Sequence, residues 1–226
     1  MRVAENPLHP ALLRLESDAF SAEALDAALA VQRNRGFTCT IDNSDTRAAA
    51  LLTARGFCLV RRTIEGGWQG EPSAPLPDLE HGTLAQRPEL TTPWLAAHKQ
   101  HYFATHRASP PAELDTARWD EVFLGEDFRP ESAFFILDGR QIAAFSSLRP
   151  AGENWELAWF GTVPENHPSF EGLNAGLVAM ETDFIAAEGI FAVLAEFDST
   201  SPDAMWRLHS CGLSEPKTYQ TYHLIR

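Results

Sequence analysis

The chain has 226 residues, 44% of them hydrophobic and 10% aromatic, and a formal net charge of −13. The apolar fraction is enough for a packed core and argues against a disordered chain. The negative charge argues against nucleic acid and anionic membrane surfaces as partners. No apolar run approaches the roughly 20 residues of a membrane-spanning helix, and the N-terminus lacks the apolar stretch of a signal peptide. We therefore expect a cytoplasmic protein of one or two domains, acting as a monomer or homodimer.

The N-terminal third of the chain alternates helical and extended patterns. Leu25, Ala28 and Leu29 share one helical face, and a strand is expected over residues 37–41. A second helix carries Ala48, Leu51 and Leu52, and Gly56 suits its left-handed stop before a strand at 58–60.

A segment rich in glycine and proline follows, over residues 66–77. It has no hydrophobic period, which is typical of a linker. The sequence therefore predicts an N-terminal part over residues 1–70, a linker over 71–78 and a larger domain over 79–226.

The larger domain begins with a candidate strand at residues 81–85, a helix opening at Thr92-Pro93 and a second helix at about 113–124. Apolar runs at 132–137 and 141–148 flank Asp138-Gly139, a strong hairpin signal because both turn positions favour positive φ. A third strand is expected at 155–163.

The end of the chain repeats the element order of residues 22–62. A helical stripe carries Leu173, Leu177, Met180 and Phe184, and a strand is expected at 191–195. Ser201 suits the N-cap of a further helix, and Pro202 its first position. Gly212 suits the stop of that helix before a last strand at 218–222.

Residues 79–226 resemble the GNAT superfamily of acyl-CoA-dependent N-acyltransferases in this order of strand, two helices, three-stranded meander, helix, strand, helix and strand. The resemblance implies an α/β fold with a mixed central sheet flanked by helices. Residues 22–65 resemble only the family's back half, as in tandem members such as mycothiol-synthase-like proteins. The segment 103–107 with Pro110, Pro111, Trp119 and 128–130 looks like those tandem proteins too. The N-terminal part is thus expected to be a partial copy that covers a sheet edge or shapes the acceptor site.

The resemblance implies that a loop opening the long helix wraps the pyrophosphate of acetyl-CoA with backbone N–H groups. The matching stretch is residues 169–176, which keeps a glycine at Gly172 but has Ser169 and Asn174 where the family pattern has Arg or Gln and a glycine. Glu171 adds negative charge there. The cofactor-binding residues expected in this loop are Ser169, Gly172, Leu173, Asn174 and Ala175.

In the family, the fourth strand splays from the fifth, and the gap admits the thioester arm of CoA. The matching positions are Phe160, Gly161, Thr162 and Val163. Gly161 suits a bulge or close approach, or simply a strand end. Ser201 matches a position that often bonds the CoA arm, and N-capping explains it equally well.

Acyl transfer to an amine needs a base, and it is helped by an acid that protonates the thiolate. Glu156 matches a glutamate base of some relatives, the alternative being a solvent-facing strand residue. Leu208 occupies the place of the usual acid tyrosine, so Tyr222 is the candidate acid, with Tyr219 and His209 also near in sequence. His98, His101, Tyr102 and His106 are expected in the acceptor wall or at the surface, not in a metal site.

These observations lead to an acyl-CoA-dependent N-acetyltransferase acting on a small amine, with acetyl-CoA as cofactor. The concentration of acid after residue 79 favours a cationic substrate, although ordinary solubility explains it too. The alternative function is a catalytically degenerate binding or regulatory module of the same fold.

Overall fold

The computed structural model describes residues 1–17, 19–32, 34–68, 70 and 78–226. The expected linker at 71–78 falls almost wholly outside the described residues. The first residues of the glycine- and proline-rich segment 66–77, Gly66 to Trp68, are instead the end of a strand. The sequence argument missed this because two adjacent glycines suggest a turn, yet both lie against the last strand of the chain, where Gly67 pairs with Ser214.

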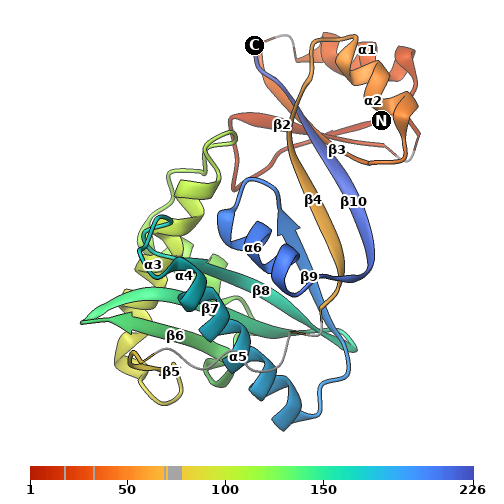
Figure 1. Ribbon diagram of the computed structural model, residues 1–226. Helices are drawn as coiled ribbons and strands as arrows, with labels where there is room; N and C mark the ends of the chain where they lie inside the picture. Colours follow the sequence, from red (N-terminus) through yellow and green to blue (C-terminus); the bar gives the residue numbers. More distant parts are fainter. Residues whose placement is uncertain (18, 33, 69, 71–77) are drawn as a thin grey trace.

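Ten strands form one continuous sheet in the order β1-β2-β3-β10-β4-β9-β8-β7-β6-β5 (Figure 1). The strands are β1 (Arg2–Ala4), β2 (Leu12–Glu16), β3 (Gly36–Asp42), β4 (Cys58–Trp68), β5 (His81–Thr83), β6 (Ala133–Asp138), β7 (Gln141–Ala151), β8 (Asn154–Thr162), β9 (Val193–Asp198) and β10 (Ser214–Leu224). Two strand pairs, β2 with β3 and β8 with β9, are parallel, and the other pairs are antiparallel. The sheet is therefore mixed, as the resemblance implied.

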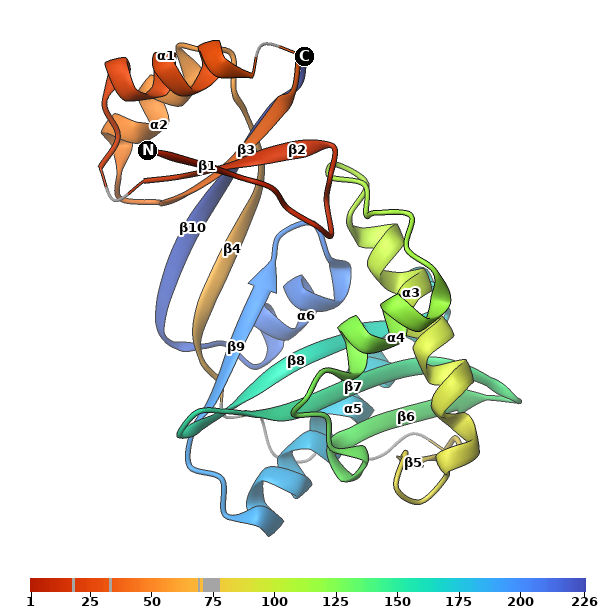
Figure 2. The same ribbon diagram turned by 180° about the vertical axis from the view of Figure 1, so that it is seen from behind.

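Helices cover the sheet in three groups (Figures 1 and 2). The helices are α1 (Ala22–Val31), α2 (Thr46–Thr53), α3 (Thr91–Thr105), α4 (Thr116–Leu124), α5 (Phe170–Glu188) and α6 (Pro202–Ser210), with short 3₁₀ turns at Pro88–Leu90 and Pro130–Ser132. α1 and α2 enclose a core with β2 and β3. On β6, Phe134 and Ile136 pack with α5, whereas Phe135 and Leu137 pack with α3 and α4. Because successive strand residues face opposite ways, these two helix layers lie on opposite faces.

The two ends of the chain exchange strands. β4, from the N-terminal part, lies between β9 and β10, and β10 lies between β3 and β4. Trp68 of β4 is 1% exposed and belongs to the core under α5 and α6, whereas Tyr222 of β10 belongs to the core under α1 and α2. Each part thus supplies a central strand to the other.

Most expected elements are present, with local differences. The structure adds β1 and β2, which were not expected from the sequence. β9 starts at Val193, and Phe191, which was expected in this strand, is 98% exposed. The hairpin turn consists of Gly139 and Arg140, of which only Gly139 has positive φ. The left-handed stop at Gly212 and the Ser201 cap are confirmed.

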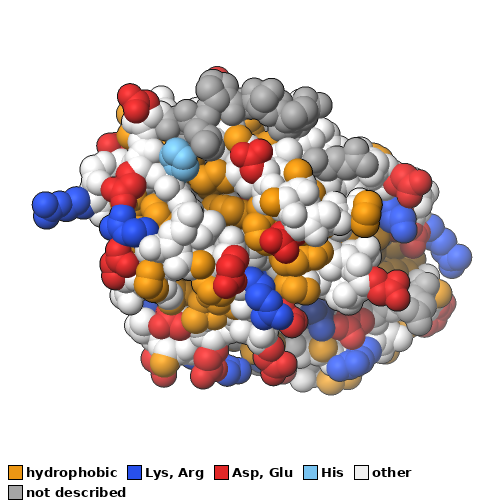
Figure 3. Space-filling model, turned by 90° about the horizontal axis from the view of Figure 1, so that it is seen from below, with side chains coloured by type: hydrophobic (Ala, Val, Ile, Leu, Met, Phe, Trp, Pro, Cys, Tyr) orange, Lys and Arg blue, Asp and Glu red, His pale blue; other side chains and the backbone are white. Residues whose placement is uncertain are grey.

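The surface shows no single-sign field on the face drawn in Figure 3, where acidic and basic side chains are dispersed among apolar ones. Among the described helices, none has the length and apolarity to span a membrane.

Candidate functional site

Strands β8 and β9 pair over only three residues and then diverge. The register ends at Leu157 opposite Ala195, while β8 continues to Thr162 and β9 to Asp198. The other edge of β9 stays paired with β4 as far as Asp198. The opening therefore lies between β8 and β9, and the backbone groups of residues 158–162 that face it have no partner on β9.

A bulge in β8 accompanies this divergence. The register with β7 shifts between Trp159 and Leu157, which makes Ala158 the extra residue. As a result Leu157 packs under α5, whereas Trp159 packs under α3. The irregularity expected near Gly161 thus lies three residues earlier, at Ala158.

A cavity of about 330 Å³ lies at the opening, and we call it the splay cavity. β8, β9, α3 and the start of α6 form most of its wall, and the N-terminal part adds His9 and Arg61. The lining residues are His9, Arg61, His98, His101, Tyr102, Thr105, His106, Arg149, Glu156, Leu157, Ala158, Trp159, Phe160, Glu196, Asp198, Thr200, Ser201 and Ala204.

Three carboxylates line the splay cavity, and two of them are held by arginine. Arg149 donates to Glu156 at 3.1 Å, and Arg61 donates to Asp198 at 2.7 Å. Among the described residues, Glu196 has no ion pair within 4.0 Å.

Solvent reaches the Glu196 side chain through the open cavity, but the surrounding chain still desolvates it. This desolvation raises its pKa, the Arg61 guanidinium opposes the rise, and the carboxylates of Glu65, Asp198 and Glu156 add to it. The cavity therefore presents one carboxyl group that has a raised pKa and no ion pair among the described residues.

A cluster of His9, Tyr102 and His106 forms the wall opposite Glu196's strand. His9 Nδ1 donates to the Ser109 carbonyl at 2.6 Å, so in the neutral ring Nε2 accepts from the Tyr102 hydroxyl at 2.9 Å. Burial lowers the pKa of His9, lowers that of His106 to about 4 and raises that of Tyr102 to about 12. All three groups are therefore neutral at pH 7 and act as hydrogen-bonding and stacking surfaces.

The other two α3 histidines are buried and line the splay cavity, so of the two expected positions, cavity wall and surface, the first applies to them. His98 is 1% exposed among the rings of Trp94, Phe123, Phe145 and Trp159, and this burial holds its pKa well below the usual value.

His101 covers Gly161 so closely that a Cβ there would lie 2.6 Å from the imidazole ring. It lines both the splay cavity and a second hollow of about 390 Å³, which reaches Thr162, Val163 and the loop to Asn166. His101 Nδ1 is 3.9 Å from Asp203 Oδ2, too far for a hydrogen bond. The imidazole thus separates two hollows that lie along the same strand edge.

The predicted pyrophosphate loop is only partly open. Ser169 caps α5 without a side-chain hydrogen bond, and space surrounds Gly172, where a Cβ would meet nothing within 4 Å. Ala175 is half-buried. Leu173 is fully buried, and its N–H donates to the Ser169 carbonyl; Asn174 is fully buried and donates to Asp203 at 2.8 Å. Neither of these last two side chains reaches the surface.

The predicted residues on β8 and at the start of α6 lie along the opening. Phe160 lines the splay cavity and stacks on Arg207, and Ser201 lines it too while accepting from the Ala204 N–H at 3.3 Å. Thr162 is buried, its hydroxyl without a partner among the described residues, and Val163 lines the second hollow.

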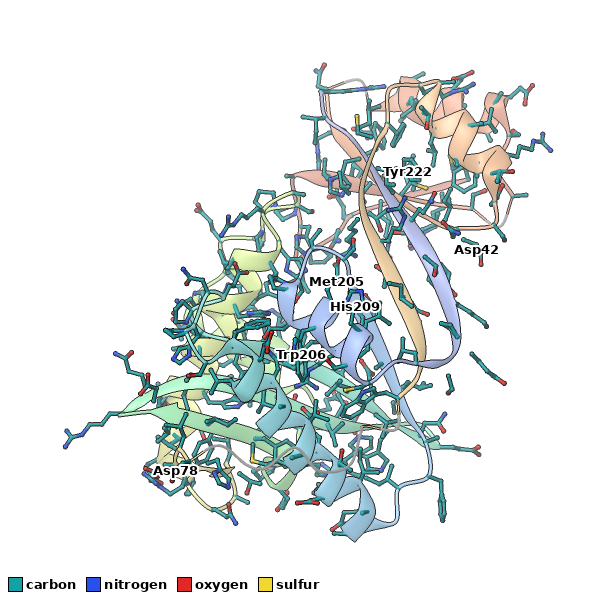
Figure 4. All side chains as sticks on the ribbon, in the orientation of Figure 1. Asp42, Asp78, Met205, Trp206, His209 and Tyr222 are labelled. Carbon is teal, nitrogen blue, oxygen red and sulfur yellow. The ribbon has the colours of Figure 1, made fainter. Side chains whose placement is uncertain are left out.

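The two predicted catalytic residues have separate locations. Glu156 lines the splay cavity, and its neighbours Trp155 and Leu157 pack under α5 on the other face, so they do not bury it. Tyr222 lies in the core under α1 and α2, and its hydroxyl donates to Gln220. Figure 4 shows Tyr222 well apart from α6, where Met205, Trp206 and His209 are labelled. The tyrosine that lines the cavity is Tyr102.

The sequence analysis did not single out Glu196, Arg61 or His9. Glu196 alternates with the buried Ala195 and Phe197, which indicated only that it faces away from α5. Arg61 and His9 come from a part of the chain whose docking on α3 has no local signal.

Comparison with solved structures supports the architecture. A GCN5-related N-acetyltransferase from Sphaerobacter thermophilus is 14% identical with a TM-score of 0.63, covering 98% of this chain and 75% of its own. A GNAT-family acetyltransferase from Colwellia psychrerythraea also matches, with 11% identity and a TM-score of 0.53; the match covers 93% of this chain and 75% of that protein. A GCN5-related N-acetyltransferase from Kribbella flavida matches with 18% identity and a TM-score of 0.52, over 89% of this chain and 72% of that protein. No family sequence model and no curated protein matches the chain. The chain therefore has the fold of the GCN5-related N-acetyltransferases.

Proposed function

We propose that this protein is an acyl-CoA-dependent N-acyltransferase that acetylates a small amine in the splay cavity. The observation that carries the proposal is the divergence of β8 and β9 directly onto a cavity holding an unpaired carboxyl group. A shared fold alone does not establish an activity, whereas this site has the parts that acyl transfer to an amine requires.

The residues fit the acyl-pantetheine arm of the donor better than its pyrophosphate. Unpaired backbone groups of β8 face the opening, where an extended arm can bond them as a neighbouring strand would. At the start of α5, the N–H groups of Glu171 and Gly172 have no backbone acceptor among the described residues and can bind a phosphate, but residues 164–172 include no lysine or arginine. We therefore assign the arm to Ala158, Phe160 and Gly161, leave Leu173 and Asn174 out, and expect modest affinity for the nucleotide end.

Glu196 is the group that we assign as general base. An amine enters as an ammonium ion, which the negative charge of Glu196 attracts, and the raised pKa of this carboxyl lets it accept the proton. The donor supplies an acyl thioester, whose carbonyl oxygen takes hydrogen bonds from the β8 backbone. The amine nitrogen bonds to the acyl carbon as the C–S bond breaks, the sulfur leaves as thiolate, and the second proton of the nitrogen passes to solvent.

No acid is assigned in this scheme. A thiol has a pKa near 8.5, so a thiolate leaves near neutral pH without a proton donor. Tyr102 has a pKa of about 12, and its hydroxyl donates a hydrogen bond to His9. We therefore assign Tyr102 to shaping the acceptor wall.

The N-terminal part completes the cavity in this proposal. His9 reaches it because the loop after β1 docks on the segment after α3, where the Ala112 N–H donates to the Leu8 carbonyl at 2.8 Å. Arg61 reaches it from β4 and neutralises Asp198. Removing that charge leaves Glu196 as the principal anion for the incoming ammonium.

Titration calorimetry with acetyl-CoA, together with amine-dependent release of free thiol, tests the proposal. Ala158→Leu fills the opening at the bulge and is expected to abolish both binding and release, whereas Ala27→Leu on the exposed face of α1 leaves both unchanged. Absence of acetyl-CoA binding to the wild-type protein at millimolar concentration would instead support the non-catalytic alternative.

A further inference from the structure

A further cavity of about 200 Å³ lies between the N-terminal part and the end of α3, and we call it the threonine cavity. It adjoins the splay cavity, since the two share His9, Arg61, Thr105, His106 and Thr200. The two cavities therefore have part of their walls in common.

The floor of the threonine cavity is one face of four adjacent strands. Thr38 of β3 pairs with Arg14 of β2 on one side and with His223 of β10 on the other. One row further along, Thr40 pairs with Thr221, and Thr221 pairs with Arg61 of β4. Cross-strand partners face the same way, so these six polar side chains form a continuous surface. The opposite face of the same strands is the apolar core under α1 and α2.

The charge of this cavity is opposite to that of the chain. Among the described residues that line it, none is Asp or Glu, although the chain has a net charge of −13. Arg14 and Arg61 are its cations. Arg14 pairs with Glu16 and Arg61 with Asp198, but each guanidinium has five N–H donors and keeps some of them for a ligand.

His223 provides an independent sign that the floor binds something. Its side chain is 5% exposed, it lines the cavity, and its Nδ1 has no hydrogen-bond partner among the described residues. A buried polar atom without a partner costs free energy unless a ligand or water bonds it. Burial lowers the pKa of His223, against a backbone hydrogen bond to Ala108 that raises it, so the ring is neutral at pH 7.

We infer that the threonine cavity binds the carboxylate of the acceptor, whose amine lies beside Glu196 in the splay cavity. This inference rests on the proposed function and names its substrate class: a small molecule, such as an amino acid or short peptide, that has both an amine and a carboxylate. Arg14, Arg61 and the threonine hydroxyls supply the charge-assisted and neutral donors for the carboxylate.

Matched acceptor pairs test the inference. Glycylglycine and γ-aminobutyrate are each compared with their carboxamides in the thiol-release assay with acetyl-CoA. Loss of a charge-assisted hydrogen bond weakens binding roughly tenfold or more. The kcat/KM of each acid should therefore exceed that of its amide by at least this factor. Arg14→Gln is expected to bring the acid-to-amide ratio towards one by raising KM for the acid. Arg47→Gln, an exposed arginine on α2, should leave the ratio unchanged. Equal use of acids and amides by the wild-type protein overturns the inference.

Calorimetry of glycylglycine and glycylglycinamide with the protein in the absence of CoA separates this inference from the proposed function. If no amine is acylated, tighter binding of the acid that is lost in Arg14→Gln still supports the carboxylate site. If amines are acylated but acid and amide bind and react alike, the proposed function stands and the carboxylate site is rejected.

Discussion

Replacing Glu196 with glutamine removes the carboxyl group that we assign as base and keeps its shape. Glu156→Gln is the matched control on the neighbouring strand, because it removes a carboxylate of the same cavity that Arg149 already holds at 3.1 Å. A positioned general base contributes about 10²- to 10⁴-fold to the rate. The ion pair of Arg149 with Glu156 is half-exposed, so its loss should cost about 1 kcal/mol at most. That energy corresponds to roughly a fivefold change in the measured rate.

Steady-state thiol release against pH distinguishes the two variants. In the wild-type protein the rate should rise with pH through the raised pKa of Glu196 and then level off. Glu196→Gln should lose at least about 100-fold and this rising limb, while Glu156→Gln keeps both. The groups facing Glu196 are Arg61 and Glu65 on β4, Asp198 on β9 and Glu156 on β8. A larger loss in Glu156→Gln than in Glu196→Gln would refute the assignment.

Thermal unfolding gives a second, independent reading of the same substitution. A carboxyl whose pKa is raised by folding lowers stability once the pH exceeds its ordinary pKa, because the folded protein holds the charge less readily than the unfolded chain. Glu196→Gln should therefore raise the melting temperature at pH 7 and have no such effect below the ordinary pKa of glutamate. A fall in melting temperature at pH 7 would mean that Glu196 has a favourable partner.

Three other perturbations test the wider model. Trp68→Ala should lower the free energy of unfolding by about 3–5 kcal/mol, because Trp68 is buried in the core under α5 and α6. In denaturant, both parts of this variant should unfold in one transition. Two separate transitions would contradict the strand exchange. Stability should fall from pH 7 to pH 4 by up to about 3 kcal/mol through His106, whose folded pKa of about 4 lies below its unfolded value. His106→Gln should flatten that slope, and an unchanged slope would assign it elsewhere. His101→Ala should tighten acetyl-CoA binding by about tenfold, because the imidazole no longer has to leave Gly161. His209→Ala, at an exposed position of α6, should leave the affinity unchanged. Weaker binding in His101→Ala would show that the ring contacts the donor.

The sequence predicts the helices and the meander well, because those elements depend on local patterns. Leu173, Leu177 and Met180 repeat at helical spacing and are buried under one face of the sheet. Backbone hydrogen bonds, by contrast, are the same for every strand, so no residue in β4 identifies β9 and β10 as its neighbours. The exchange was consequently invisible to sequence reasoning.

For the same reason, the sequence predicted only some of the residues that line the candidate site. Glu156 and Ser201 follow from their positions in the family order, and both line the splay cavity. Glu196 could be recognised only once residues of α3 were known to line the same cavity, because a charged residue on an alternating strand ordinarily indicates solvent. Burial is the main cause of its raised pKa, and the carboxylates that add to it lie on three different strands.

The reciprocal positions of β4 and β10 have a consequence during protein synthesis. Residues 1–68 contain almost all of the N-terminal part, yet its sheet stays incomplete between β3 and β4 until residues 214–224 leave the ribosome. Until then β3 and β4 each present an unpaired edge, which other chains can join. A nascent chain of this protein should depend on chaperones that shield strand edges, and ribosome pausing before codon 214 should increase its aggregation.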